Sequence, residues 1–138
     1  MAGQVSRPTA VVWCLVLSVI NGVGGVIFTA AWPDLEDRAR ALLVSIVIGT
    51  LLVTTAWFLS NGNRWGAIAA LVLNALNILL AIPEYFDPQM AFIVGGTITV
   101  TLSALTLGLA LSPGARAFWS GASHITAESN SAVSPIQR

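Results

Sequence analysis

Long apolar runs alternate along this chain with short polar connections. Between Asp87 and Arg116 there is no ionisable side chain, and almost every residue is apolar, small or hydroxylated. At ~1.5 Å rise per residue, a helix of that length crosses the ~30 Å hydrocarbon core of a bilayer. Three similar runs precede it, so the pattern predicts an all-α integral membrane four-helix bundle of two antiparallel hairpins. The predicted spans are residues 9–32, 41–60, 65–82 and 88–112.

The polar connections predict where these helices begin and end. Residues 34–40 are expected to form the charged first turns of the second helix, because two acid–Arg pairs have i,i+4 spacing there. The same charges could instead bind an ion or a partner. Residues 61–64 form a compact polar turn, which makes spans two and three antiparallel neighbours. Asp87 followed by Pro88 is a typical start signal for the fourth helix.

The carboxyl-terminal part differs from the bundle. Ser112, Pro113 and Gly114 are expected to stop the fourth helix. The chain is thus predicted to divide into a bundle, residues 1–112, and an interfacial segment with a short disordered cytoplasmic tail, residues 113–138. The tail is rich in serine and too weakly apolar to bury a core.

Small residues recur at helical spacing in two spans, which predicts either helix packing or a partner interface, since small side chains let helix backbones approach closely. In the first span they are Ser18, Gly22 and Gly25. In the fourth span they form a small-residue ladder, Ala91, Gly95, Thr99 and Ser103. The glycines of the first span could also kink that helix or leave a small cavity.

Three amide side chains lie within the predicted spans. Asn74 and Asn77 share one face near the middle of span three, and Asn21 lies in span one. An amide in hydrocarbon needs a partner, so Asn74 and Asn77 are expected to point into the bundle, towards Asn21. Two interpretations remain open: interhelical packing bonds, or a polar lining for a small neutral solute.

Composition supports the membrane interpretation. Hydrophobic residues make up 56% of the chain and charged residues 9%, against ~25% charged in a typical soluble domain. The net charge is zero, which gives no electrostatic reason to expect binding to nucleic acid or strong binding to anionic lipid. All basic residues are arginine, a hint of a GC-rich bacterial genome. The single cysteine, Cys14, excludes an intrachain disulfide.

Arginine positions predict the orientation. Arg7, Arg64 and Arg116 fall on one side of the predicted bundle, and Arg38 and Arg40 on the other. By the positive-inside rule, both termini are expected in the cytoplasm of a cell whose cytoplasmic membrane holds the protein. The first span is expected to be retained, since its apolar run is longer than that of a signal peptide.

None of the four predicted spans contains an Asp, Glu, His, Lys or Arg side chain. No metal-ligand spacing, nucleophile–base pair or phosphate-binding glycine loop occurs, so no catalytic residue, cofactor or metal site is predicted, and the protein is not expected to be an enzyme. The chain also lacks the membrane-embedded Glu of small multidrug exporters, the paired cysteines of vitamin K epoxide reductase-like enzymes and the signatures of double-barrelled fluoride channels.

Two functions from different classes fit this pattern. The first is a non-enzymatic accessory, immunity or regulatory protein that binds a membrane-protein partner, or itself, within the lipid bilayer. The alternative is a homo-oligomeric channel, a holin-like protein or a transporter for a small neutral solute, lined by Asn21, Asn74, Asn77 and hydroxyls of the fourth span.

Overall fold

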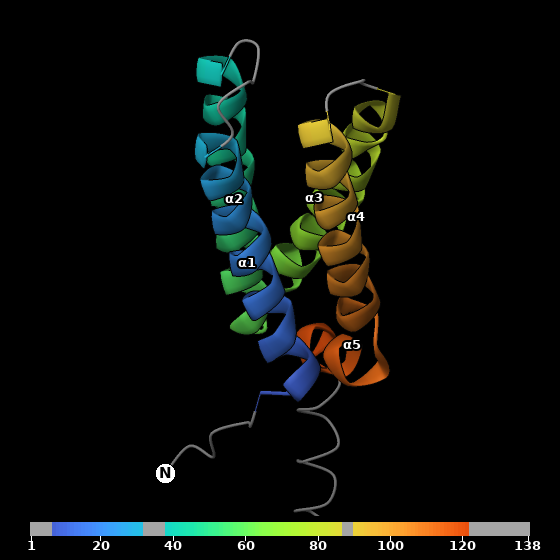
Figure 1. Ribbon diagram of the computed structural model, residues 1–138. Helices are drawn as coiled ribbons and strands as arrows, with labels where there is room; N and C mark the ends of the chain where they lie inside the picture. Colours follow the sequence, from blue (N-terminus) through green and yellow to red (C-terminus); the bar gives the residue numbers. More distant parts are fainter. Residues whose placement is uncertain (1–6, 32–37, 87–89, 122–138) are drawn as a thin grey trace, which may run out of the picture.

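The computed structural model describes residues 7–31, 38–86 and 90–121. This part of the chain forms four long helices, one turn of 3-10 helix and a short final helix (Figure 1). In chain order they are α1 (Thr9–Ala31), α2 (Arg38–Ser60), α3 (Arg64–Ala81), η1 (Pro83–Phe86), α4 (Met90–Ala110) and α5 (Pro113–Ser120).

The four long helices coincide with the four predicted spans to within a few residues, and each is long and apolar enough to cross a membrane. The prediction of an all-helical chain with four membrane-length apolar helices is therefore confirmed for the described residues. The predicted acid–Arg pairs of residues 34–40, the Asp87–Pro88 helix start and the tail beyond residue 121 lie wholly or partly outside the described residues. Residues 83–86, expected as a loop, form a 3-10 turn.

The helices close a ring in which each long helix contacts the next, and α4 contacts α1. Figure 1 shows the α1–α2 and α3–α4 hairpins close together at the end that holds residues 61–63 and α5, here named the turn end. The ribbons diverge towards the opposite end, here named the far end. Burial follows this geometry: none of residues 38–48 of α2 is buried, whereas Gly49, Leu52, Ala56, Leu59 and Ser60 are. The bundle is packed most tightly towards the turn end.

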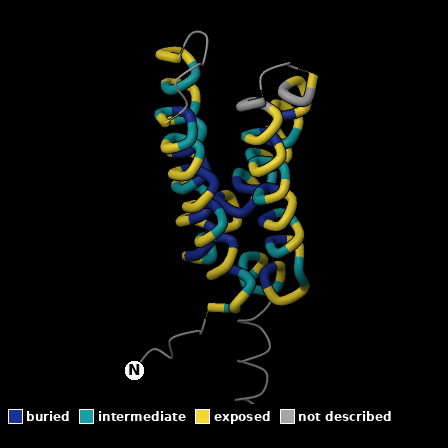
Figure 2. Tube along the Cα trace, viewed as in Figure 1, coloured by how far each residue is buried: buried dark blue, intermediate teal, exposed yellow. Residues whose placement is uncertain are grey.

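The interior is built mainly of small residues, and many large aliphatic side chains are exposed. Figure 2 shows exposed, intermediate and buried residues alternating along the helices. Only 22–33% of each membrane-length segment is buried within the chain. Ile27, Leu43 and Leu80 are 62%, 65% and 61% exposed. An apolar surface of this extent needs lipid to cover it. The arrangement supports a multi-pass membrane protein.

A local signal sets the connection between α2 and α3. Gly62 adopts a left-handed backbone with φ of 74°, a conformation that favours glycine. Asn63 then caps α3, because its Oδ1 accepts hydrogen bonds from the backbone N–H groups of Trp65 (2.9 Å) and Gly66 (3.2 Å). Gly66 lies so close to Phe58 that a Cβ atom has no space there. The turn and the glycine together bring α3 directly against the end of α2.

The fourth helix ends at Ala110, as the Ser112–Gly114 signal predicts, and a separate short helix, α5, follows at once. Ser112 leaves the helical conformation with ψ of 148°, and Pro113 starts α5 as one of its first residues, where its missing N–H costs nothing. Trp119 Nε1 donates to the carbonyl oxygen of Ala110 at 3.3 Å, which holds α5 against the end of α4. Gly121, with φ of 76°, ends α5 in the left-handed conformation.

Candidate functional site

Three helices meet at one hydroxyl in the middle of the bundle. Asn21 Nδ2 donates to Ser103 Oγ at 3.0 Å, and Asn77 Nδ2 donates to the same oxygen at 3.1 Å. All three residues are buried, Ser103 completely. The amides of α1 and α3 thus point into the bundle, and they are joined through α4 rather than directly to each other. We refer to these three residues as the polar junction.

Asn74 is bonded differently from Asn77, although both are buried. Its Nδ2 donates to the carbonyl oxygen of Ala70 in the same helix at 2.8 Å. Its Oδ1 and the buried Ser18 hydroxyl have no partner within the described part of the chain. Asn74 and Ser18 each lie about one helical turn nearer the turn end than Asn77 and Asn21. This level therefore holds one buried acceptor and one buried hydroxyl without a partner in the described part of the chain.

Single polar contacts continue along α1 in both directions from the polar junction. Towards the turn end, the Cys14 thiol donates to the carbonyl oxygen of Thr106 at 3.6 Å. Towards the far end, Thr29 and Ser45 hydroxyls lie 3.0 Å apart. Because the Thr29 hydroxyl donates to the Gly25 carbonyl at 2.9 Å, Ser45 is the donor to Thr29. These bonds tie α1 to α4 and to α2.

The predicted small residues of α1 have different surroundings. A Cβ on Gly22 would lie 2.8 Å from the carbonyl oxygen of Gly49, so the backbones of α1 and α2 touch here. Ser18 is buried, as described above. A Cβ on Gly25 would meet no atom within 4 Å. Close helix contact in the described chain is therefore made at Gly22 and not at Gly25.

The small-residue ladder of α4 faces the other helices of the same chain where its side chains are described. Ser103 belongs to the polar junction, and a Cβ on Gly95 would lie 3.1 Å from the Phe28 ring of α1. Thr99 is half-buried. The side chain of Ala91 lies outside the described part of the structure. Packing within one chain thus occupies the ladder at Gly95 and Ser103.

A second set of small residues lies on the outward side of α4, here named the outer stripe. It consists of Thr97, Thr101, Ala104 and Gly108. All four are exposed, and their spacing places them on one helical face. Thr97 and Thr101 donate their hydroxyls to carbonyls of α4 itself, both at 2.8 Å. Sequence reasoning did not single out this face, because both sides of α4 carry small residues at similar spacing.

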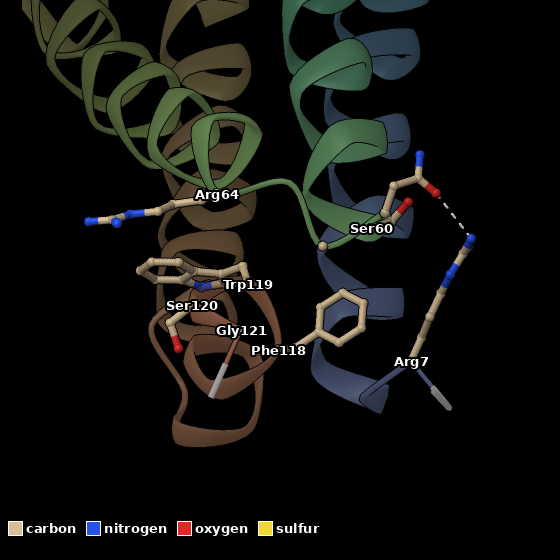
Figure 3. A pocket seen from close by; sticks show the side chains of 9 residues that line it. Arg7, Ser60, Arg64, Phe118, Trp119, Ser120 and Gly121 are labelled. Carbon is tan, nitrogen blue, oxygen red and sulfur yellow. Dashed lines mark hydrogen bonds between the residues drawn. The ribbon is translucent and has the colours of Figure 1, made fainter. Parts of the chain in front are cut away.

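A pocket of about 460 Å³ opens at the turn end. It is lined by Arg7, by residues 60–62 and Arg64 around the α2–α3 turn, and by residues 118–121 of α5 and its end (Figure 3). Figure 3 shows Arg7 on one side of the Phe118 ring and Arg64 on the other, extended past Trp119. The sequence did not indicate this site, because its residues come from three segments that only the tertiary structure brings together.

Most polar side chains of this turn-end pocket are already bonded. The hydroxyls of Ser60 and Ser120 donate to backbone carbonyls of their own helices, and Trp119 donates to Ala110. Arg7 Nη2 donates to Asn61 Oδ1 at 3.2 Å, which leaves most of its N–H groups free. Among the residues that the structure describes, no acidic side chain lines the pocket. Its available side-chain donors are therefore mainly two guanidinium groups.

Neither site carries an obvious reactive centre. The described residues contain no group of three His, Cys, Asp or Glu side chains that could hold a metal ion. What the sites offer is hydrogen bonding, close helix contact and positive charge. Comparison of the chain with protein-family models, with curated proteins and with solved structures finds no match.

Proposed function

We propose that the protein is a non-enzymatic accessory component of a membrane, and that its partner is a transmembrane helix of a larger membrane protein bound at the outer stripe. The observation that carries the proposal is the exposure of Gly108 and its neighbours on α4. A Cβ at Gly108 would meet nothing within 4 Å. A second helix could therefore bring its backbone close to α4 at this position.

The chemistry of the outer stripe suits a dry contact between helices. The hydroxyls of Thr97 and Thr101 are bonded to the backbone of α4, so covering them with a partner leaves no polar group unpaired. The exposed Ile98 and Leu105 stand beside the stripe as larger ridges. A groove of small residues next to aliphatic ridges resembles the surfaces through which membrane helices associate.

The polar junction supports an accessory protein more than a lined path. Asn21 and Asn77 direct their amide donors to Ser103, and all three are buried. Bonds of this kind in membranes contribute ~0.6 kcal/mol each to helix association. Under the alternative function, a channel or transporter, the same side chains would have to exchange these bonds for bonds to a solute.

For the membrane topology, we place the turn end on the cytoplasmic side of a bacterial cytoplasmic membrane, together with both termini. Arg7, Arg64 and Arg116 belong to this end of the described bundle, and Arg38 and Arg40 to the far end. The positive-inside rule favours this orientation. Cysteine-accessibility labelling of intact cells, with a cysteine introduced at Asn61, tests it: membrane-impermeant reagent should leave this position unlabelled.

The partner is tested by extraction of the tagged protein from its native membrane into nanodiscs, followed by native mass spectrometry. We expect a larger membrane protein at fixed stoichiometry. Gly108→Leu should lower its recovery at least tenfold, because the added side chain fills the close contact. The matched control is Gly24→Leu, which adds the same side chain at an exposed position on α1 and should leave recovery unchanged.

Other results would contradict the accessory function. A defined homo-oligomer without a second protein would favour the channel or transporter, and a monomer would remove the basis for either. Solute flux into proteoliposomes separates these outcomes further. Replacing both Asn74 and Asn77 by Leu should abolish flux if the protein is a channel, and should change only its stability if it is an accessory protein.

A further inference from the structure

We propose that the turn-end pocket binds the phosphate-bearing headgroup of an anionic phospholipid, through the guanidinium groups of Arg7 and Arg64. This proposal is independent of the partner of α4. It rests on the shape of the pocket, on the state of its hydrogen-bond donors, and on its level relative to the membrane.

The first argument is charge. Arg7 and Arg64 are exposed, and none of the described residues that line the pocket between them is acidic. The pocket therefore has a local excess of positive charge, although the net charge of the whole chain is zero. Five of the six acidic residues, at positions 34, 36, 37, 84 and 87, belong to the α1–α2 and α3–α4 connections, which start at the far end of the bundle. A local basic site of this kind attracts anionic headgroups even when the chain as a whole is neutral.

The second argument concerns the donors. Ser60, Trp119 and Ser120 all donate to backbone carbonyls, so they compete little for a ligand. The guanidinium groups remain, and their planar N–H geometry matches the oxygens of a phosphate. In Figure 3 the two side chains lie on opposite sides of the Phe118 ring, with Arg64 extended outward past Trp119 and Arg7 directed to Asn61. A headgroup placed in the pocket would therefore have one arginine side chain on either side of it.

The third argument is the level of the pocket in the membrane. Trp57, Phe58 and Trp65, at the ends of α2 and α3 beside it, are 54%, 47% and 77% exposed. Exposed aromatic residues at the ends of membrane spans mark the headgroup region. Phe118 and Trp119 line the pocket itself. The lipid phosphates of that layer are the anions present there at the highest local concentration, which favours lipid over free phosphate as the source.

The test uses the full-length protein in nanodiscs of phosphatidylcholine with increasing phosphatidylglycerol. Retention of phosphatidylglycerol is measured by native mass spectrometry. At ~1 kcal/mol per arginine near a charged surface, each guanidinium should be worth about 5-fold in apparent affinity, and Arg7→Gln with Arg64→Gln together about 30-fold. Arg7→Lys with Arg64→Lys should retain part of the binding, because the charge remains while the planar donors are lost.

Two control variants separate a specific site from general surface charge. Arg116→Gln removes a charge from the same end of the bundle but outside the pocket, and Arg40→Gln removes one at the far end. Arg40→Gln should change lipid retention by no more than about twofold. Arg116→Gln should change it by no more than about the 5-fold expected for one charge near an anionic surface, against about 30-fold for the double Gln variant. Circular dichroism and thermal unfolding verify that each variant retains the fold, as expected for substitutions at exposed positions.

Three results would overturn the proposal. The first is lipid retention that persists in the double Gln variant. The second is a loss with Arg116→Gln as large as that of the double Gln variant. Either result would show that the pocket is not the binding site. If inorganic phosphate binds in pure phosphatidylcholine nanodiscs with the same dependence on Arg7 and Arg64, and displaces phosphatidylglycerol, the site takes free phosphate and the lipid assignment is wrong.

Discussion

Two of the contacts that hold helix α1 in the bundle have opposite characters. Against α2 it places backbone on backbone, with Gly22 and Gly49 so close that a Cβ on Gly49 would lie 2.7 Å from the carbonyl oxygen of Gly22. Against α3 and α4 it relies on the polar junction, in which Asn21 and Asn77 share the hydroxyl of Ser103. The glycine contact leaves no space for a side chain, and the polar junction depends on one acceptor atom, the Ser103 hydroxyl oxygen.

This difference determines which substitutions each contact tolerates. A glycine contact gains its stability from dispersion over two closely apposed backbones, so any added side chain must push the helices apart. A hydrogen-bonded junction can accept a side chain of similar shape, but it loses stability when the acceptor is removed. Matched substitutions in the two contacts therefore separate the contribution of close packing to stability from that of hydrogen bonding.

The largest effect is expected from Gly22→Leu. The new Cβ would lie 2.8 Å from the carbonyl oxygen of Gly49, and backbone cannot move aside as a flexible side chain can. We expect the free energy of unfolding to fall by about 3 kcal/mol, measured by unfolding in mixed detergent micelles. Gly24→Leu, at a position with open space, serves as the control and should change it by less than ~0.5 kcal/mol. Equal losses in both variants would show that the α1–α2 contact is not backbone to backbone.

An intermediate effect is expected from Ser103→Ala. The substitution removes the one acceptor for two buried amide donors, and at ~0.6 kcal/mol per interhelical bond the loss should be roughly 1.2 kcal/mol. Thr101→Ala is the control on the exposed face of the same helix, where the hydroxyl bonds only to α4. Combining Ser103→Ala with Asn77→Leu in a double-mutant cycle should give less than the sum of the single losses. Strict additivity would contradict a shared acceptor.

The smallest effect is expected from Thr29→Val, which keeps the shape of the side chain and removes one hydrogen bond between α1 and α2. The unfolding free energy should fall by about 0.6 kcal/mol. Thr50→Val removes a hydroxyl that bonds only within α2 and should have no measurable effect. A loss as large as that of Gly22→Leu would mean that hydrogen bonding, and not backbone proximity, dominates the α1–α2 contact.

Span positions could be predicted from the sequence because they depend on local properties. An apolar run bounded by Pro, Asn-Gly or charged residues has few alternatives to a membrane helix, and α1 to α4 follow these runs closely. The start of α5 could also have been predicted from the sequence, since Ser112 followed by Pro113 is typical of an N-cap and a first helical residue. The Pro-Gly pair was interpreted there only as a stop.

Which face of α4 points inward could not be predicted. The ladder through Gly95 and Ser103 and the outer stripe through Thr97 and Gly108 are both small, and propensity does not distinguish them. Which of the two faces is buried depends on the rotation of α4 about its axis relative to α1 and α3, and that rotation is set by the packing of the whole bundle. The same holds for Ser103 as the acceptor of two amides, and for the pocket between Arg7 and Arg64.

The polar junction also sets an order for the biogenesis of the protein. Ser103 follows Asn21 by 82 residues and Asn77 by 26, so the acceptor is synthesised after both donors. At about 5–20 residues per second, Asn21 waits roughly 4–16 s for its partner. Until the fourth helix is synthesised, both amides lack the acceptor that they share in the folded chain.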